Sequence, residues 1–308
     1  DVGFEGPSFD FSAYWDDIFL GAPVDANPNS LLPNLSMAIE IDKIWINDTQ
    51  SMEKVSGTFF YQDELWQTFI LSSHLSDGAS FDLLIQPGDD GNRRFSLRSD
   101  NAGDAFRFLG TYDSMQGGDL TITGIYQDHS KGHPLIGNVS VKDYRIVDAP
   151  VLAHILSIMA LTGILDALSG EGIGFNSLEA PFLYQEGITQ LKSARANGTS
   201  LGFTAEGHVY RNADVVDIQG TVVPAYALNS VLGHIPVLGA LLTGGEKGGG
   251  VFAANYYMSG SLDAPKIVVN PLSALTPGFL RNVFDVFDKA QDGFQFAPGD
   301  NLKISTPN

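Results

Sequence analysis

The sequence of 308 residues contains no cysteine. This absence excludes disulfide bonds, thiolate zinc sites, cysteine-held iron–sulfur clusters and cysteine nucleophiles. Basic residues are scarce too, because 17 Lys and Arg stand against 36 Asp and Glu and give a formal net charge of −19. A surface of this sign repels phosphates, so the sequence argues against nucleic acid as a partner and against flat docking on anionic headgroups.

Long hydrophobic runs and a leader segment are also missing. The chain starts at Asp1 without a basic and apolar leader, so we expect any targeting signal to lie outside this sequence. The longest uncharged apolar stretch, residues 149–165, reaches only the lower limit for a membrane-spanning helix and is interrupted by Pro150 and Gly163. We expect this segment to be covered by protein or by lipid rather than to span a bilayer.

Hydrophobic residues make up 44% of the chain, which is enough for a substantial core, and Gly, Pro, Phe and Tyr are frequent. This composition is typical of many strands and turns. Short turn-like separators between the early strands leave no room for crossover helices and predict an antiparallel meander. The expected strands are 37–46, 55–62, 65–75, 80–86, 93–98, 119–126, 135–147, 174–184, 189–194, 201–210, 215–223, 251–262 and 266–269.

The first expected strand carries an irregularity. Residues 37, 39 and 41 are apolar on one parity, whereas Ile44 and Ile46 fall on the other. Because side chains alternate between the two faces of a strand, we predict a bulge or bend near Asp42 and Lys43.

Helical spacing interrupts the strand pattern at several places. We expect a helix over 102–115, ended by Gly117 and Gly118, and a nearly all-apolar helix over 151–168, with Asp148 as its cap and Pro150 in its first turn. Further apolar or amphipathic segments cover 226–242 and 277–287, and a short helix is expected at 12–20.

Several short motifs resemble catalytic or binding sites, but their context favours structure. Gly198–Gly202 has the G-x-S-x-G spacing of a hydrolase nucleophile with Ser200 at its centre, yet a turn followed by a strand indicates a hairpin. His129 and His133 lie in a glycine-containing polar loop, which favours a solvated loop over a metal site. His154 and Asp166 are interpreted as a polar helix stripe.

Three other motifs fail their own patterns. The calcium-loop-like stretch from Asp25 lacks the required Gly and Glu, the Gly-rich segment 244–250 lacks the Ser or Thr of a phosphate loop, and 170–172 lacks the preceding strand of a dinucleotide site. We therefore expect no catalytic residue, no metal and no cofactor.

From about residue 99 to residue 286 the chain resembles the AsmA-like C-terminal region of the AsmA, YhdP and TamB group of Gram-negative envelope proteins. The motifs that carry this resemblance are Ser99–Gly103, Ala149–Leu152, Leu161–Asp166, Leu168–Ile173, Gly220–Tyr226, Asn229–Ser230, Ile235–Gly239, Val269–Leu275 and Pro277–Arg281. Residues 1–98 match only by strand pattern.

The resemblance implies a mainly β fold with helices: an elongated, open, curled sheet of antiparallel type with an apolar groove and apolar helices near its C-terminal end. It also implies a non-enzymatic protein that handles phospholipid or another acyl lipid in the periplasm or cell envelope, with an inner-membrane anchor outside this sequence. An envelope membrane or outer-membrane protein is a further expected partner. About thirteen strands at about 4.8 Å spacing would span on the order of 60 Å if they share one sheet.

On this basis we expect residues 1–98 to form a β-meander part of the groove, 99–290 the AsmA-like region and 291–308 a loose tail. The candidate lipid-binding residues are Val151, Leu152, Ile155, Leu156, Met159, Ile164, Leu165, Leu238, Leu241, Phe279, Leu280 and Phe284.

Three alternatives stay open at this point. The strands could close into a sandwich or barrel, because alternation alone does not distinguish these folds from an open sheet. The protein could be a structural or docking module that holds no lipid. It could also be a hydrolase that uses Ser200, which the hairpin context disfavours.

Overall fold

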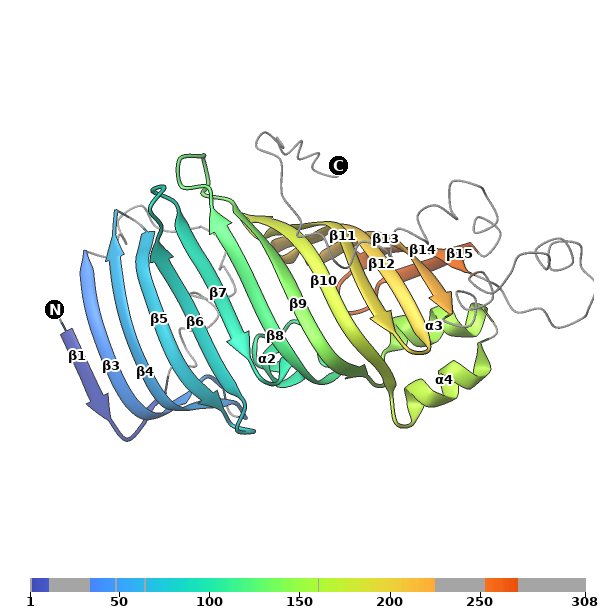
Figure 1. The fold of residues 1–308 in the computed structure, drawn as a ribbon, viewed down its shortest axis with the longest axis horizontal. Helices are drawn as coiled ribbons and strands as arrows, with labels where there is room; N and C mark the ends of the chain where they lie inside the picture. Colours follow the sequence, from blue (N-terminus) through green and yellow to red (C-terminus); the bar gives the residue numbers. More distant parts are fainter. Residues whose placement is uncertain are drawn as a thin grey trace, which may run out of the picture.

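The computed structural model describes residues 2–10, 34–47, 49–63, 65–159, 161–224 and 253–270. Most of these residues are in β-strands, and the strands join one large sheet (Figure 1). The prediction of a mainly β fold with helices is confirmed.

The N-terminal half of the sheet precedes, in sequence, the two helices at residues 150–169. Its elements are β1 (Val2–Gly6), β2 (Phe9–Asp10), β3 (Leu35–Trp45), β4 (Ser51–Gln62), β5 (Leu65–Leu75), β6 (Ser80–Pro87), β7 (Arg93–Ser99), α2 (Ala102–Phe108), β8 (Met115–Tyr126) and β9 (Leu135–Ile146).

The C-terminal half continues the same sheet. Its elements are α3 (Pro150–Ile158), α4 (Thr162–Ser169), β10 (Ile173–Gln185), β11 (Ile188–Gly198), β12 (Leu201–Tyr210), the short 3-10 helix η1 (Arg211–Ala213), β13 (Val215–Pro224), β14 (Ala254–Ser261) and β15 (Lys266–Asn270).

From β3 to β15 each strand pairs antiparallel with its neighbour in sequence, so the predicted meander is confirmed. The pairing of β7 with β8 carries the sheet without interruption across residue 98. The N-terminal edge differs from the expectation, because β1 and β2 pair parallel to β3. Val2 faces Met37 and Phe9 faces Ile44, the same offset of 35, so β1 and β2 are one edge strand interrupted around Pro7, which has no N–H to donate.

The sheet is open and strongly curled. Its pairing runs from the β1–β2 edge to β15, and in the described residues no ladder joins these two edges, which rules out a closed barrel or a two-sheet sandwich. The strands curl away from the viewer, so that β12–β15 lie behind β10 and α2 lies on the concave side (Figure 1). The curl brings α3 into contact with β15.

All three α-helices of the described residues lie at one end of the sheet. The helix α2 joins β7 to β8, and α3 and α4 join β9 to β10, whereas the described part of the opposite end carries turns and the short η1. We call these the helix end and the hairpin end.

Two helices are shorter than the sequence suggests. The helix expected over 102–115 ends at Phe108, because Gly110 has a φ of 60° and stops it, while Gly117 and Gly118 lie inside β8. Asn101 caps this helix by accepting a hydrogen bond from the Asp104 N–H.

The helix expected over 151–168 is two helices, of which the first ends at Ile158 and the second begins at Thr162. Its first helical residue is Pro150, as predicted, but Asp148 does not cap it: Asp148 has a φ of 48° and Ala149 takes the cap position without a side-chain bond. The break lets Met159 and Leu161 both enter the core, where they are 0% and 8% exposed.

A line of irregularities, at which one residue pair drops out of the ladder without a change of register, interrupts β3, β4, β8, β9 and β10 near the helix end, and we call it the crease. Within five strands, successive residues of one face are three positions apart instead of two, namely Ile41/Ile44, Met52/Val55, Gly117/Leu120, Val141/Tyr144 and Phe175/Leu178. Lys54, Gly118 and Asp143 lie in these gaps with φ between 52° and 92°. The bend predicted near Asp42 belongs to this line, because Lys54 lies between the ladder pairs Ile41–Val55 and Lys43–Glu53.

Candidate functional site: the apolar face of the sheet

The register of the ladders sorts the side chains of the sheet into two contrasting faces. Residues that pair directly share a face, so a chain of pairs traces a row across the sheet. One such row crosses every strand from β3 to β15 and contains only apolar residues and glycine: Met37, Phe59, Phe69, Ile85, Phe95, Gly124, Gly137, Phe182, Leu191, Gly207, Ile218, Met258 and Ile267.

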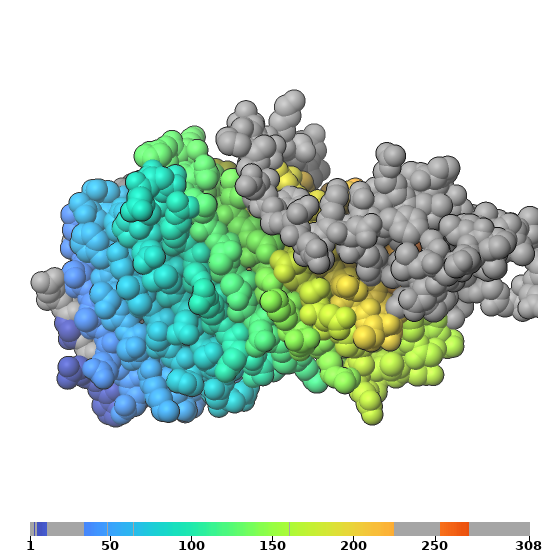
Figure 2. Space-filling view, in the orientation of Figure 1, coloured from blue at the N-terminus to red at the C-terminus, as the bar shows by residue number. Residues whose placement is uncertain are grey.

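The opposite face has a matching row in which every residue is polar or charged. Its members are Glu40, Ser56, Ser72, Asp82, Arg98, Thr121, Ser140, Glu179, Arg195, Thr204, Thr221, Asn255 and Asn270. We call the two sides the apolar face and the polar face. The polar face also exposes single large apolar side chains, namely Phe60, Ile70, Tyr257 and Val268. Figure 2 shows the molecule from its convex side, and α2 lies on the far, concave side. Since Phe108 of α2 contacts Phe81 of the apolar face, the apolar face is the concave one.

The apolar face is not uniformly buried. Between the crease and the hairpin end many of its side chains are only half-buried although they touch the hydrophobic core. This set comprises Met37, Ile39, Phe95, Ile122, Val139, Leu178, Leu191, Phe203, Met258 and Ile267. A face that keeps this much apolar surface in contact with water gains free energy if another apolar molecule covers it.

Glycines on this face are filled by neighbouring side chains. A Cβ atom at Gly137 would lie 2.7 Å from Cζ of Phe182, and one at Gly124 would lie 2.7 Å from Cδ1 of Leu135. These two glycines pair with each other in the ladder. They are therefore packing sites for large neighbours and do not by themselves mark a binding site.

The helix end of the apolar face is closed. Beyond the crease the side chains are almost fully buried, as shown by Ile44, Met52, Met115, Ile146, Ile173 and Phe175, each at most 6% exposed. The Phe108 ring of α2 packs 5.1 Å from that of Phe81. Tyr144 stacks on Phe175 at 5.2 Å; its hydroxyl has no hydrogen-bond partner, and burial raises the pKa of this phenol.

The structure describes seven of the twelve candidate lipid-binding residues. Ile155, Leu156 and Met159 of α3 and its end are at most 2% exposed and belong to the hydrophobic core. The other four, which are half-buried and pack against this core, are Val151, Leu152, Ile164 and Leu165. Their role toward lipid stays a prediction.

The remaining five candidates, Leu238, Leu241, Phe279, Leu280 and Phe284, lie outside the described residues. The same holds for the segments expected to be helical at 12–20, 226–242 and 277–287, for the calcium-loop-like and 244–250 motifs, and for the tail 291–308.

Aromatic side chains lie along the margin of the apolar face at the hairpin end, and we call this margin the aromatic edge. The rings of Tyr61 and Trp66 lie 5.1 Å apart with an edge-to-face angle of 66°, and Trp66 also contacts Phe69 of the apolar row at 5.6 Å. Tyr126 and Tyr184 both pair with Leu135 and so continue this edge across β8 and β10. Tyrosine and tryptophan have an apolar body and a polar tip, which suits a boundary between apolar surface and water.

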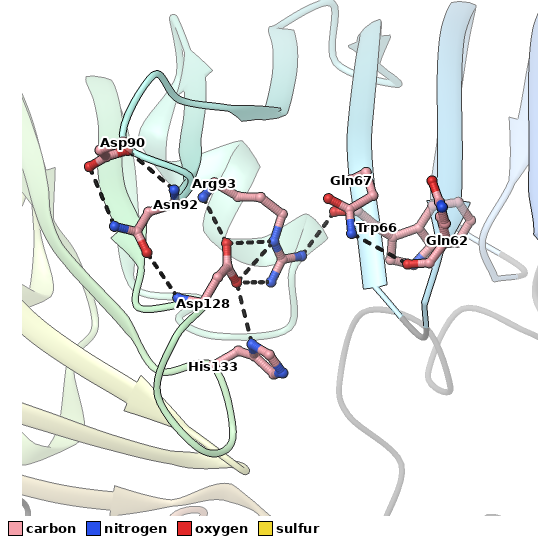
Figure 3. A network of polar contacts seen from close by, with 8 residues as sticks. All are labelled: Gln62, Trp66, Gln67, Asp90, Asn92, Arg93, Asp128 and His133. Atoms are coloured by element: carbon pink, nitrogen blue, oxygen red, sulfur yellow. Dashed lines mark hydrogen bonds and ion pairs between the residues drawn. The ribbon is translucent and has the colours of Figure 1, made fainter.

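A polar network holds this aromatic edge together (Figure 3). The Arg93 guanidinium donates from Nε and Nη2 to the Asp128 carboxylate at 3.1 and 2.7 Å, and from Nη1 to the Trp66 carbonyl at 2.9 Å. It also lies 4.3 Å from the ring centre of Tyr126. The network joins β5, β7 and the turn between β8 and β9.

The Arg93–Asp128 ion pair is buried, with side-chain exposures of 7% and 12%. Burial alone would raise the pKa of Asp128, but the hydrogen bonds and charge of Arg93 outweigh it and hold that pKa below its usual value. His133 lies 3.4 Å from the same carboxylate. Because Arg93 already contacts three groups of the protein, we interpret it as an anchor of the edge rather than a free binding group.

The structure also shows where the catalytic-looking motifs lie. Thr199 and Ser200 form the two-residue loop of the hairpin between β11 and β12, which confirms the hairpin and leaves Ser200 without the strand–turn–helix setting of a nucleophile. His129 and His133 lie in the turn before β9, and His154 and Asp166 are exposed on α3 and α4. In the described residues no three His, Asp or Glu side chains gather as metal ligands would.

Comparisons of this chain with protein-family models, with curated proteins and with solved structures found no match. Among the described helices none has the length and apolarity needed to cross a bilayer.

Sequence reasoning missed the Arg93–Asp128 pair and the aromatic edge. These residues lie 35 positions apart in sequence, and no local spacing links them. The sequence signal was a charged residue at the start of one strand and another in a polar turn, a combination that is common in ordinary hairpins.

Proposed function

We propose that this protein binds acyl lipids on the apolar face of its open sheet and transfers or holds them without chemical conversion. The observation that carries the proposal is the pair of rows described above: one row is apolar across thirteen successive strands, and the opposite row is polar across the same strands. A sheet of this kind in a protein that needs only a core would be closed by a second layer along its whole length.

The half-buried side chains supply the driving force for binding. Transfer of an acyl chain from water to an apolar surface is favourable by about 0.8 kcal/mol per buried methylene group. Phe95, Ile122 and Val139 lie on adjacent strands in the middle of the sheet and offer such a surface. The headgroup stays in water, so binding requires no buried charge.

The resemblance to the AsmA-like region extends this proposal. It suggests that the lipid is a phospholipid, that the setting is the periplasm or cell envelope of a Gram-negative bacterium, and that the chain serves as the C-terminal part of a device for lipid transfer between membranes. Contact with an envelope membrane or an outer-membrane protein belongs to the same proposal.

The proposal can be tested with two neighbouring substitutions on β8. Ile122 is half-buried on the apolar face, whereas Thr123 is exposed on the polar face. We expect Ile122→Lys to abolish copurification of phospholipid in native mass spectrometry and to slow transfer of fluorescent phosphatidylethanolamine between vesicles. Thr123→Lys adds the same charge on the other face and should leave both readouts as in the original protein.

Two outcomes would contradict the proposal. Detergent-free protein that carries no lipid and transfers none would instead support a structural or docking module. Lipid binding that Ile122→Lys and Thr123→Lys reduce equally would place the lipid elsewhere. Circular dichroism spectra of both variants control for loss of fold.

A further inference from the structure

The two ends of the apolar face differ in polarity, and this difference orients the ligand. We infer that a bound amphiphile lies along the strands, with its polar head at the hairpin end and its chain pointing toward the crease and the helix end. The inference rests on the proposed function and names the ligand class: a lipid with a single polar head and chains of ordinary membrane length.

The hairpin end suits a headgroup because it joins polar groups to the apolar surface. Tyr184 is 36% exposed at the margin of the apolar face, and Tyr126 continues the same row two strands away, on the other side of Leu135. Exposed polar residues of the turn between β8 and β9, including His129 and Lys131, follow directly. A headgroup there keeps its water and still leaves its chain on apolar side chains.

The helix end cannot accept a headgroup without a large loss of hydration. The residues beyond the crease are apolar and almost fully buried, and α2 packs over the face at Phe81. The polar Tyr144 hydroxyl at this end already lacks a partner. Burial of a polar group without hydrogen bonds costs a few kcal/mol, and burial of an ionised phosphate costs more.

The length of the apolar face between the hairpin end and the crease fits one acyl chain, although Phe182 and Ala180 on this path of β10 are each only 7% exposed and the half-buried surface lies on the neighbouring strands. From Tyr184 at the hairpin end to Leu178 beside the crease the strand β10 advances six residues, which is about 20 Å at about 3.3 Å per residue. One leaflet of a bilayer has a hydrocarbon thickness of about 15 Å, half of the full core. A membrane lipid can therefore extend its chain along the strand without reaching the closed end.

A pair of fluorescent reporters on one strand tests the orientation. Trp15, Trp45 and Trp66 are the natural tryptophans, and their replacement by Phe gives a background in which a single new Trp can be placed. Tyr184→Trp reports on the hairpin end and Leu178→Trp on the region beside the crease. Ser177→Trp lies next to Leu178 but on the polar face and serves as the matched control.

The probes are two phosphatidylcholines, one with a nitroxide on the headgroup and one with a nitroxide at the end of an acyl chain. We expect the headgroup nitroxide to cause the larger loss of fluorescence at position 184, and the chain-end nitroxide to cause the larger loss at position 178. Neither probe should quench the Trp at position 177. If Leu178→Trp does not fold, Phe203→Trp, in the same row on β12, replaces it.

The outcomes separate this inference from the proposed function. If native mass spectrometry shows bound lipid but the two nitroxides quench in the reverse order, or equally at both positions, the orientation is wrong and lipid binding stands. If no lipid is bound and no reporter is quenched, the proposed function itself fails. Quenching at position 177 would place the lipid on the polar face and overturn both.

Discussion

Removal of the Arg93 side chain should be among the most damaging single changes in this protein. Arg93→Met keeps an unbranched apolar stem but leaves the Asp128 carboxylate, only 12% exposed, without its bidentate partner. Removal of one partner of a buried ion pair costs about 3–5 kcal/mol, mainly because the other charge stays buried. Such a loss is a large part of the total stability of an ordinary domain, about 5–15 kcal/mol.

The neighbouring Arg94 provides a matched control. Its ion pair with Asp90 has a similar N–O distance, 2.9 Å, but both side chains are at least 40% exposed. Because solvent screens exposed ion pairs and they contribute little to stability, Arg94→Met should change the free energy of unfolding little. Urea denaturation followed by circular dichroism measures both variants. Equal losses for Arg93→Met and Arg94→Met would refute the view that burial of the pair fixes the hairpin end.

Three further predictions follow from burial and packing. The pKa of Asp128 is lowered in the folded protein, so the contribution of this carboxylate to stability should be present above its unfolded pKa, about 3.9. That contribution should be lost as the pH falls below this value, and the loss should be absent in Asp128→Asn. Ile155 is 2% exposed, so Ile155→Asp should lower the melting temperature sharply, whereas Ile158→Asp on the same helix, at a residue 43% exposed, should not. An Ile155→Asp variant that stays folded and only loses lipid would show that α3 lines the binding surface. Gly137→Ala should destabilise the protein by about 1–3 kcal/mol because its Cβ would clash with the carbonyl oxygen of Thr123 and lie 2.7 Å from the Phe182 ring, whereas Gly174→Ala, with open space around it, should be nearly neutral in the same thermal melts.

Much of the sheet could be predicted from sequence because each strand is marked by residues that lie close together in the chain. The strands at 65–75 and 201–210 were predicted with the bounds that the structure shows, since alternation and turn residues mark both ends. The parity change between Ile41 and Ile44 indicates a bend from the sequence alone. In each case the signal lies within about ten residues of chain.

The features that the sequence did not reveal depend on how strands align. The apolar row exists only in a particular register, and a slip by one residue in any ladder would break it. The parallel edge formed by β1 and β2 depends on pairing across residues 11–33, which alternation cannot show. The split between α3 and α4 is decided by tertiary packing of Met159 and Leu161, which overrides helix propensity.

The sequence predicts the apolar character of the candidate site better than its location in the fold. Apolar runs in the sequence point to the helices as the lipid contacts, whereas the half-buried apolar surface lies mostly on strands such as β7, β8 and β9. Hydrophobicity alone identifies which residues avoid water, but it does not distinguish those covered by the protein from those left for a ligand.

The strict neighbour-to-neighbour order of the strands from β3 to β15 has a consequence for how this protein can vary. Each strand forms ladders only with the strands before and after it, so the backbone pairing resembles that of a linear repeat array. Insertion or loss of one hairpin would widen or narrow the concave surface by about 10 Å, two strand spacings, without changing the pairing order of the other strands. The capacity of the surface can thus change in steps of one hairpin while the architecture stays the same.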